Sequence, residues 1–145
     1  MADTLSLARF LDHSEKIAVV GLGYVGLPLA VHLARHFSVV GFDVKPSRIE
    51  ELLVGHDRTR EVEAADLSSP NLHLTGDEQA LSRCRLIIVA VPTPIDEARI
   101  PDLEAIRGAS AIAGRRLRRG GCVVYESTVY PGVTEEVCVP ILEAE

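Results

Sequence analysis

The sequence has no tryptophan, only three cysteines and no excess of basic residues. Cys84, Cys122 and Cys138 form no C-x-x-C pair, and no histidine stands near them at the spacing of a zinc site. We therefore expect neither a disulfide framework nor a metal site, and we predict all three as small core residues. The formal net charge of -6 gives no support for a nucleic acid or an anionic membrane as partner.

Long hydrophobic runs are also missing from the sequence. No apolar stretch approaches the roughly 20 residues that cross a membrane. Residues 1–15 carry acids and lack the basic-then-apolar layout of a signal peptide, so we predict a cytoplasmic protein. The basic cluster "RRLRR" at 115–119 is predicted to be the solvated end of a helix, where cations are favoured. An anion-binding or inter-subunit patch is the alternative for this cluster.

Short apolar runs alternate with amphipathic ones after a polar leader at 1–15. The runs "KIAVV", "SVVGFDV", "LHLT", "RLIIVAV" and "GCVVYEST" are typical of buried strands. Helices are predicted between or after them over 24–37, 46–55, 76–84, 102–117 and 131–145, and 56–71 is predicted as a loop with one helical turn. This order predicts an α/β fold of a single domain at 16–145. The domain is expected to be a Rossmann-like, doubly wound parallel sheet in a three-layer α/β/α arrangement.

Three glycines lie between the first predicted strand and the first predicted helix, in "KIAVVGLGYVG". Gly21 is predicted to make the tight turn, Gly23 to let the backbone approach a pyrophosphate, and Gly26 to let the helix lie close on the strand. The helix N-terminus would offer free N–H groups and partial positive charge to the phosphates. The predicted pyrophosphate site therefore comprises Gly21, Leu22, Gly23, Tyr24, Val25 and Gly26.

An acidic residue is expected at the end of the next strand, roughly 20 residues on, where it accepts hydrogen bonds from the adenosine ribose. Asp43 in "VVGFDV" stands there, and a turn or capping role is compatible with that function. An aspartate repels a 2'-phosphate, which favours NAD over NADP, although a nearby arginine can accommodate that phosphate. We predict that Arg48 flanks the adenine and that NAD is the cofactor.

Two further segments follow strands at the same expected sheet edge, where ligands of open α/β sheets bind. Val91, Pro92, Thr93 and Pro94 are predicted to line the ribose and nicotinamide side of the cofactor. Ser127 and Thr128 in "EST" offer hydroxyl groups near the reacting carbon. The alternative is that these hydroxyl groups satisfy loop backbone atoms.

Four stretches in this order, "KIAVVGLGYVGLPLA", "GFDVKPSRIEEL", "VPTPID" and "YESTVYPG", give the sequence a more specific likeness. Together they resemble the N-terminal domain of nucleotide-sugar 6-dehydrogenases, the UDP-glucose and GDP-mannose dehydrogenase family. The resemblance covers residues 16–145. "HDRTREVE" and "GLPLA" look like members that oxidise UDP-N-acetylgalactosamine, UDP-N-acetylglucosamine or UDP-N-acetylmannosamine.

The resemblance implies a function and roles for individual residues. The family oxidises the C6 alcohol of a nucleotide sugar, here expected to be a UDP-sugar, to the carboxylate in two NAD-dependent hydride transfers, and the members of this subgroup supply surface polysaccharides. Ser127 would touch the nicotinamide half, and Thr128 would match a threonine near the catalytic water. Glu126 stands where some members carry lysine, so no catalytic role is carried over to it.

The resemblance also implies what this chain lacks. The family's nucleophilic cysteine lies downstream in a Gly-rich stretch, and none of the three cysteines here matches that motif. The last helical pattern stops at the terminus, so we expect a chain cut before its substrate domain, inactive alone, from a parent that is a homodimer or larger. A stand-alone NAD-binding module and the cofactor domain of another β-hydroxyacid-type dehydrogenase are the alternatives.

Overall fold

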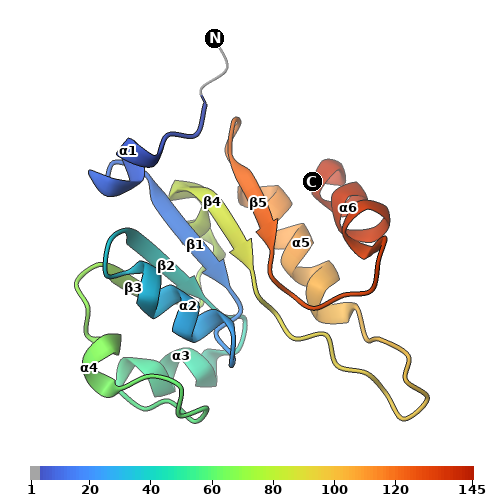
Figure 1. The fold of residues 1–145 in the computed structure, drawn as a ribbon, viewed down its shortest axis with the longest axis horizontal. Coiled ribbons are helices and arrows are strands. Elements are labelled where there is room, and N and C mark those ends of the chain that lie inside the picture. The colour runs from blue at the N-terminus through green and yellow to red at the C-terminus, as the bar shows by residue number, and fades with distance from the viewer. Residues whose placement is uncertain (1–3) are drawn as a thin grey trace.

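Five parallel strands form one sheet in the order β3-β2-β1-β4-β5 (Figure 1). They are β1 (Lys16–Val20), β2 (Ser38–Phe42), β3 (Leu72–Thr75), β4 (Cys84–Val89) and β5 (Cys122–Tyr125). The computed structural model describes residues 4–145. Ala18 of β1 is fully buried between Val40 of β2 and Ile87 of β4, as expected for β-branched runs covered on both faces.

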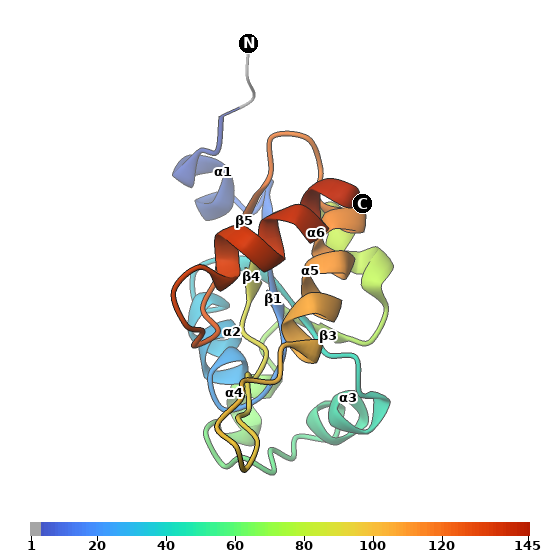
Figure 2. The same cartoon turned by 90° about the vertical axis from the view of Figure 1, so that its right-hand side faces the viewer.

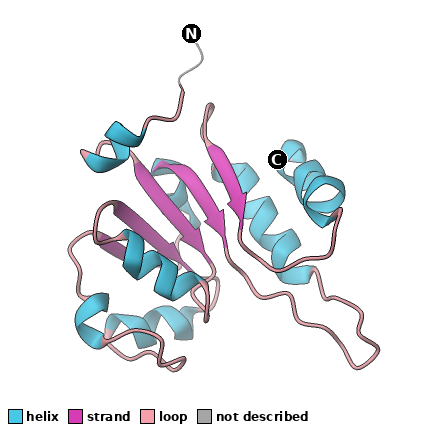
Figure 3. Cartoon of the chain, viewed as in Figure 1, coloured by secondary structure: helices cyan, strands magenta, loops and turns pink. Residues whose placement is uncertain are grey.

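Helices cover both faces of this sheet, and Figure 3 shows them distinguished from the strands. The α-helices are α1 (Leu7–Leu11), α2 (Gly26–Leu33), α3 (Pro46–Leu53), α4 (Ala64–Leu67), α5 (Glu104–Arg116) and α6 (Val139–Ala144). A 3-10 helix η1 (Glu78–Arg83) and a π-helical turn η2 (Thr134–Cys138) complete the elements described. One core cluster joins α2 and α3 to the sheet, and a second joins α5, η1 and η2 to its other face. Figure 2 shows α2 and α5 on opposite sides, which confirms the predicted three-layer Rossmann-like fold.

The strand order reverses direction between β1 and β4. The chain runs from β1 to β2 and β3 on one side, then crosses to β4 and β5 on the other. The N–H of Ala90, just after β4, donates to the carbonyl of Val20 at 2.8 Å, so the carboxyl ends of β1 and β4 lie side by side. Ligands of open α/β sheets bind at such a reversal point.

The leader contributes to the core, which its polar composition did not indicate. Within it, α1 places Phe10 against Ile17 of β1 and Ile88 of β4, and the Phe10 side chain is buried. Residues 1–3 lie outside the described residues. Burial of a phenylalanine typically stabilises a fold by about 1.5–3 kcal/mol, so α1 belongs to the folded unit.

Two predicted helices differ in type from the expectation. The predicted helix at 76–84 is the 3-10 helix η1, which Asp77 caps by accepting a hydrogen bond from the Gln79 amide. The last predicted helix begins with the π-helical turn η2 before α6. Pro140 has no N–H to donate into the preceding turn, which favours the wider turn ahead of it.

The basic cluster at 115–119 is partly ion-paired at the end of α5. Arg115 and Arg116 contact Glu78, with N–O distances of 3.2 and 2.6 Å, and Arg118 contacts Glu15 at 2.8 Å. These contacts tie α5 to η1 and to the start of β1. None of the described helices is long and apolar enough to cross a bilayer.

Candidate functional site

The chain makes a tight turn after β1, and this turn requires glycine at two positions, Gly21 and Gly26. Gly21 has a φ of +98°, and its N–H donates to the Phe42 carbonyl at 2.9 Å. A Cβ atom on Gly21 would lie 3.0 Å from the Val91 backbone. A Cβ atom on Gly26 would lie 1.7 Å from the Gly21 carbonyl oxygen, so α2 can approach β1 this closely only without a side chain there.

The outer part of this loop is open and carries unpaired amides. A Cβ atom on Gly23 would meet nothing within 4 Å. Within residues 4–145, the N–H groups of Gly23, Tyr24, Val25 and Gly26 donate no hydrogen bond. Tyr24 and Val25 are exposed beside them. Free amides at the start of α2, where the helix dipole is positive, make a cradle for an anion such as a pyrophosphate.

Asp43 joins this loop to the end of β2. One carboxylate oxygen accepts a hydrogen bond from the Leu22 amide and the other accepts one from the Lys45 amide, both at 2.9 Å. The carboxylate is half-buried and keeps lone pairs for further donors. The carboxylate thus performs the turn role that the sequence allowed and is able to receive ribose hydroxyl groups beside the glycine loop.

Arg48 lies behind the glycine loop, and its side chain is buried. Its Nε donates to the Leu22 carbonyl oxygen at 2.8 Å. Its two terminal nitrogens donate to Glu51 and Asp57, also at 2.8 Å. Arg48 also contributes to the wall of a cavity beside the glycine loop, and its contact with an adenine remains a prediction.

A cavity of about 490 Å³ opens beside the glycine loop, and we call it the cofactor cavity. Several predicted residues line it: Gly21, Leu22, Gly23, Tyr24, Asp43, Arg48, Val91 and Pro92. Sequence reasoning missed other lining residues, which come from the 56–62 loop and from α5: Arg58, Thr59, Glu104, Ala105, Gly108 and Ile112. The helical spacing of 105, 108 and 112 could have indicated one shared face, but nothing in the sequence points that face to a ligand.

The loops after β4 and β5 are held together by hydroxyl groups. Ser127 Oγ donates to the Val91 carbonyl at 2.6 Å, and Thr93 Oγ1 donates to the Thr128 carbonyl. For these protein contacts the structure follows the alternative in which hydroxyl groups satisfy loop backbone atoms. Pro94 and Thr128 are exposed in these loops, and their contact with a cofactor remains a prediction.

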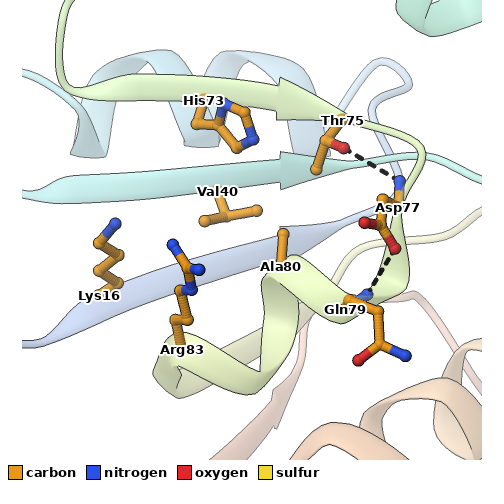
Figure 4. A pocket seen from close by; sticks show the side chains of 8 residues that line it. All are labelled: Lys16, Val40, His73, Thr75, Asp77, Gln79, Ala80 and Arg83. Carbon is orange, nitrogen blue, oxygen red and sulfur yellow. Dashed lines mark hydrogen bonds between the residues drawn. The ribbon is translucent and has the colours of Figure 1, made fainter.

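A second cavity, of about 250 Å³, lies on the sheet face under η1 (Figure 4). Its wall includes Lys16 of β1, His73 of β3 and Arg83 of η1, with Asp77 at the side. It shares no lining residue with the cofactor cavity. We call it the sheet-face cavity, and its Lys16 and Arg83 side chains make it a competing location for an anionic ligand.

The cysteines of the chain do not form a reactive centre. Cys84 and Cys138 are buried, Cys122 is half-buried, and all three are free thiols. Burial raises the pKa of the Cys84 thiol to about 12, which disfavours the nucleophilic thiolate. No group of His, Cys, Asp and Glu side chains in residues 4–145 could hold a metal ion.

The glycine turn, the free amides of α2 and the acid at the end of β2 together define a dinucleotide-binding domain of the Rossmann type. Comparison with known proteins narrows this class. The model for the "UDP-glucose/GDP-mannose dehydrogenase family, NAD binding domain" matches residues 15–145. The chain therefore belongs to the UDP-glucose/GDP-mannose dehydrogenase family, as its NAD-binding domain. This result confirms the predicted family and the predicted cofactor.

Individual relatives agree with this assignment. The chain is 55% identical over 129 residues to a UDP-N-acetyl-D-glucosamine 6-dehydrogenase of Pseudomonas aeruginosa, covering 88% of this chain and 31% of the relative. It is 50% identical over 128 residues to the protein of that name from Salmonella typhi, covering 88% and 30%. The structure of an NDP-N-acetyl-D-galactosaminuronic acid dehydrogenase from Methanosarcina mazei superposes with a TM-score of 0.81 and 31% identity, covering 98% of this chain and 34% of that one. The chain thus spans about a third of the length of these relatives.

Proposed function

We propose that this chain is the cofactor-binding part of an enzyme that oxidises the C6 alcohol of UDP-N-acetylglucosamine to the carboxylate, for surface polysaccharide synthesis. The observation that carries the proposal is the 55% identity to a UDP-N-acetyl-D-glucosamine 6-dehydrogenase, through the segment that forms the cofactor cavity. The 50% identity to a second protein of that name favours this sugar over its epimers.

The chain's own groups are arranged to hold NAD in an orientation for hydride transfer. When bound, NAD would supply the hydride acceptor for each oxidation step. The free amides of residues 23–26 would donate hydrogen bonds to the pyrophosphate, and the carboxylate of Asp43 would accept hydrogen bonds from the adenosine ribose. A 2'-phosphate would meet that carboxylate, so the site favours NAD over NADP.

The nicotinamide half of the cofactor is assigned to the loops after β4 and β5. The Thr93–Thr128 and Ser127–Val91 hydrogen bonds hold these loops against each other at the carboxyl edge of the sheet. No described residue is hydrogen-bonded to the Thr128 hydroxyl group, and Thr128 is exposed. We propose that this hydroxyl group holds the water or substrate oxygen next to the reacting carbon.

Sugar recognition and the covalent step are assigned to the part of the enzyme that this chain does not represent. The relatives are about three times as long, and burial raises the pKa of the Cys84 thiol, which disfavours its nucleophilic thiolate. We further propose that the whole enzyme acts in the cytoplasm as a homodimer or larger assembly. The 145-residue chain should accordingly bind NAD without oxidising a sugar.

Kinetics of the whole enzyme and of the 145-residue chain would test this function. NADH formation is followed with UDP-N-acetylglucosamine, its galacto and manno epimers, and UDP-glucose. We expect the highest kcat/KM for UDP-N-acetylglucosamine in the whole enzyme and no turnover by the chain alone. A preference for UDP-glucose or for an epimer would contradict the substrate assignment. NADH formation by the chain alone would contradict the assignment of sugar binding and the covalent step to another part of the enzyme.

A further inference from the structure

A buried ionic network lies directly behind the glycine loop. Its centre is Arg48, whose side chain is 6% exposed and which contacts Asp57 and Glu51 at 2.8 Å each. Asp57 is almost as buried, with a side chain that is 2% exposed. A buried guanidinium ion needs such counter-charges, and its planar group fixes the direction of each hydrogen bond.

Asp57 is held in turn by the loop that follows it. Its two carboxylate oxygens accept hydrogen bonds from the Thr59 hydroxyl group and from the amides of Thr59, Glu61 and Val62. Burial would raise the pKa of Asp57, but the hydrogen bonds from Thr59, Arg48 and these amides outweigh it and hold the pKa well below its ordinary value. The 57–62 loop and Arg48 therefore form one connected unit.

Besides lining the cofactor cavity with Arg48, Arg58 and Thr59, this unit contacts the glycine loop at the peptide group between Leu22 and Gly23. Arg48 Nε donates to the carbonyl oxygen of Leu22, at 2.8 Å. The described chain has no cis peptide bond, so the C=O of Leu22 and the N–H of Gly23 point in opposite directions. With the carbonyl directed at Arg48, the Gly23 N–H is directed away from the guanidinium group, in the part of the loop where a Cβ atom on Gly23 would meet nothing within 4 Å.

We propose that Arg48 and Asp57 are positioning residues for cofactor binding, acting through the Leu22 carbonyl to fix the direction of the Gly23 amide. Asp57 orients the guanidinium group, and the guanidinium group orients the peptide. Asp57 lies outside the glycine motif, and the sequence did not predict it as a site residue. The inference rests on the proposed function, because it assumes that the pyrophosphate of NAD binds at the glycine loop.

Calorimetric titration of the folded chain with NAD and with ADP-ribose tests the proposal, using the variants Asp57→Asn and Arg48→Lys. Asparagine removes the charge at nearly constant volume, and lysine keeps the buried cation without the planar fork. We expect each variant to weaken both ligands about tenfold, the loss of roughly one charge-assisted hydrogen bond. Adenosine, titrated by NMR, has no pyrophosphate, and its affinity should stay unchanged in Asp57→Asn, because Asp57 does not line the cofactor cavity.

Glu78→Gln supplies a matched control. Glu78 also accepts hydrogen bonds from two arginines, Arg115 and Arg116, but it does not line the cofactor cavity. This variant should lower the melting temperature without changing the affinity for NAD. Thermal unfolding of every variant shows which proteins are folded at the temperature of the titration.

The outcomes separate this inference from the proposed function. Failure of the wild-type chain to bind NAD would contradict the proposed function itself. Normal NAD affinity in folded Arg48→Lys would overturn the positioning role, and this variant decides the result if Asp57→Asn does not fold. A parallel loss of adenosine affinity in folded Asp57→Asn would also overturn it, because that result would place the effect of Asp57 at the adenosine and not at the Gly23 amide.

Discussion

Alanine substitutions at Gly26 and Gly23 separate the structural use of the glycine loop from its use in binding. At Gly26 the new Cβ atom would lie 1.7 Å from the Gly21 carbonyl oxygen, whereas ordinary contacts begin at 3.4 Å. The distance would have to double, so α2 or the loop must move. Overpacking of this kind costs about 1–3 kcal/mol, or roughly 3–10 °C in melting temperature. Loss of NAD binding should accompany it, because the loop amides move with the backbone.

Gly23→Ala is the matched variant in the same loop. Its Cβ atom would meet nothing within 4 Å, so the melting temperature should stay within about 2 °C of the wild type. The methyl group would occupy the space that a pyrophosphate needs, and we expect NAD affinity to fall about 10- to 100-fold.

Differential scanning fluorimetry and calorimetric titration of both variants make the comparison. The predicted pattern is loss of stability and binding for Gly26→Ala, and loss of binding alone for Gly23→Ala. Wild-type NAD affinity in Gly23→Ala would refute the assignment of the pyrophosphate to this loop. An unchanged melting temperature in Gly26→Ala would refute the geometry of the turn.

Four further predictions concern other parts of the chain. Asp43→Ala should weaken NAD at least about tenfold in a binding titration, because the ribose loses its acceptor; unchanged affinity would count against the site. Gly108→Ala in α5 should raise the free energy of unfolding in urea by about 0.5–1 kcal/mol while weakening NAD, since its Cβ atom meets nothing within 4 Å but faces the cofactor cavity; a loss of stability would contradict this. The pKa of Asp57 is lowered from its ordinary value of 3.8, so the stabilising effect of its carboxylate should be present above that pH and decline below it. The difference in the free energy of unfolding in urea between the wild type and Asp57→Asn should therefore shrink on acidification. A difference that stays constant with pH would contradict the ionised network. The Cys84 thiol, with a pKa of about 12, should resist alkylation at mildly alkaline pH until the protein unfolds, and rapid modification of the folded chain would show that it is accessible.

The sequence predicted the part of the site that depends on local spacing. A glycine triplet between a strand and a helix, followed by an acid at the next strand end, has one geometric solution in a parallel sheet. The hydrogen bond from the Leu22 amide to Asp43, at 2.9 Å, joins the glycine loop to this acid in the structure. The five strands were also predictable from local sequence, because buried parallel strands have near-continuous apolar sequences.

The sequence could not predict contacts that depend on how a polar stretch folds back. Asp57 lies in a segment without periodicity and meets Arg48 only because the chain turns at Gly55, which has a φ of +79°. Phe10 is similar, since its burial depends on where α1 meets β1 and β4 rather than on the polar residues around it. Long-range packing of this kind has no local sequence signal.

The most direct test of the central claim is an NMR titration of the isotopically labelled chain with NAD, observed at the backbone amides. We predict saturable shifts at residues 21–26 and at Asp43, with the largest change at Gly23, and no change around the sheet-face cavity. Absence of saturable binding, or shifts confined to Lys16, His73 and Arg83, would contradict the claim that this chain holds NAD at its glycine loop.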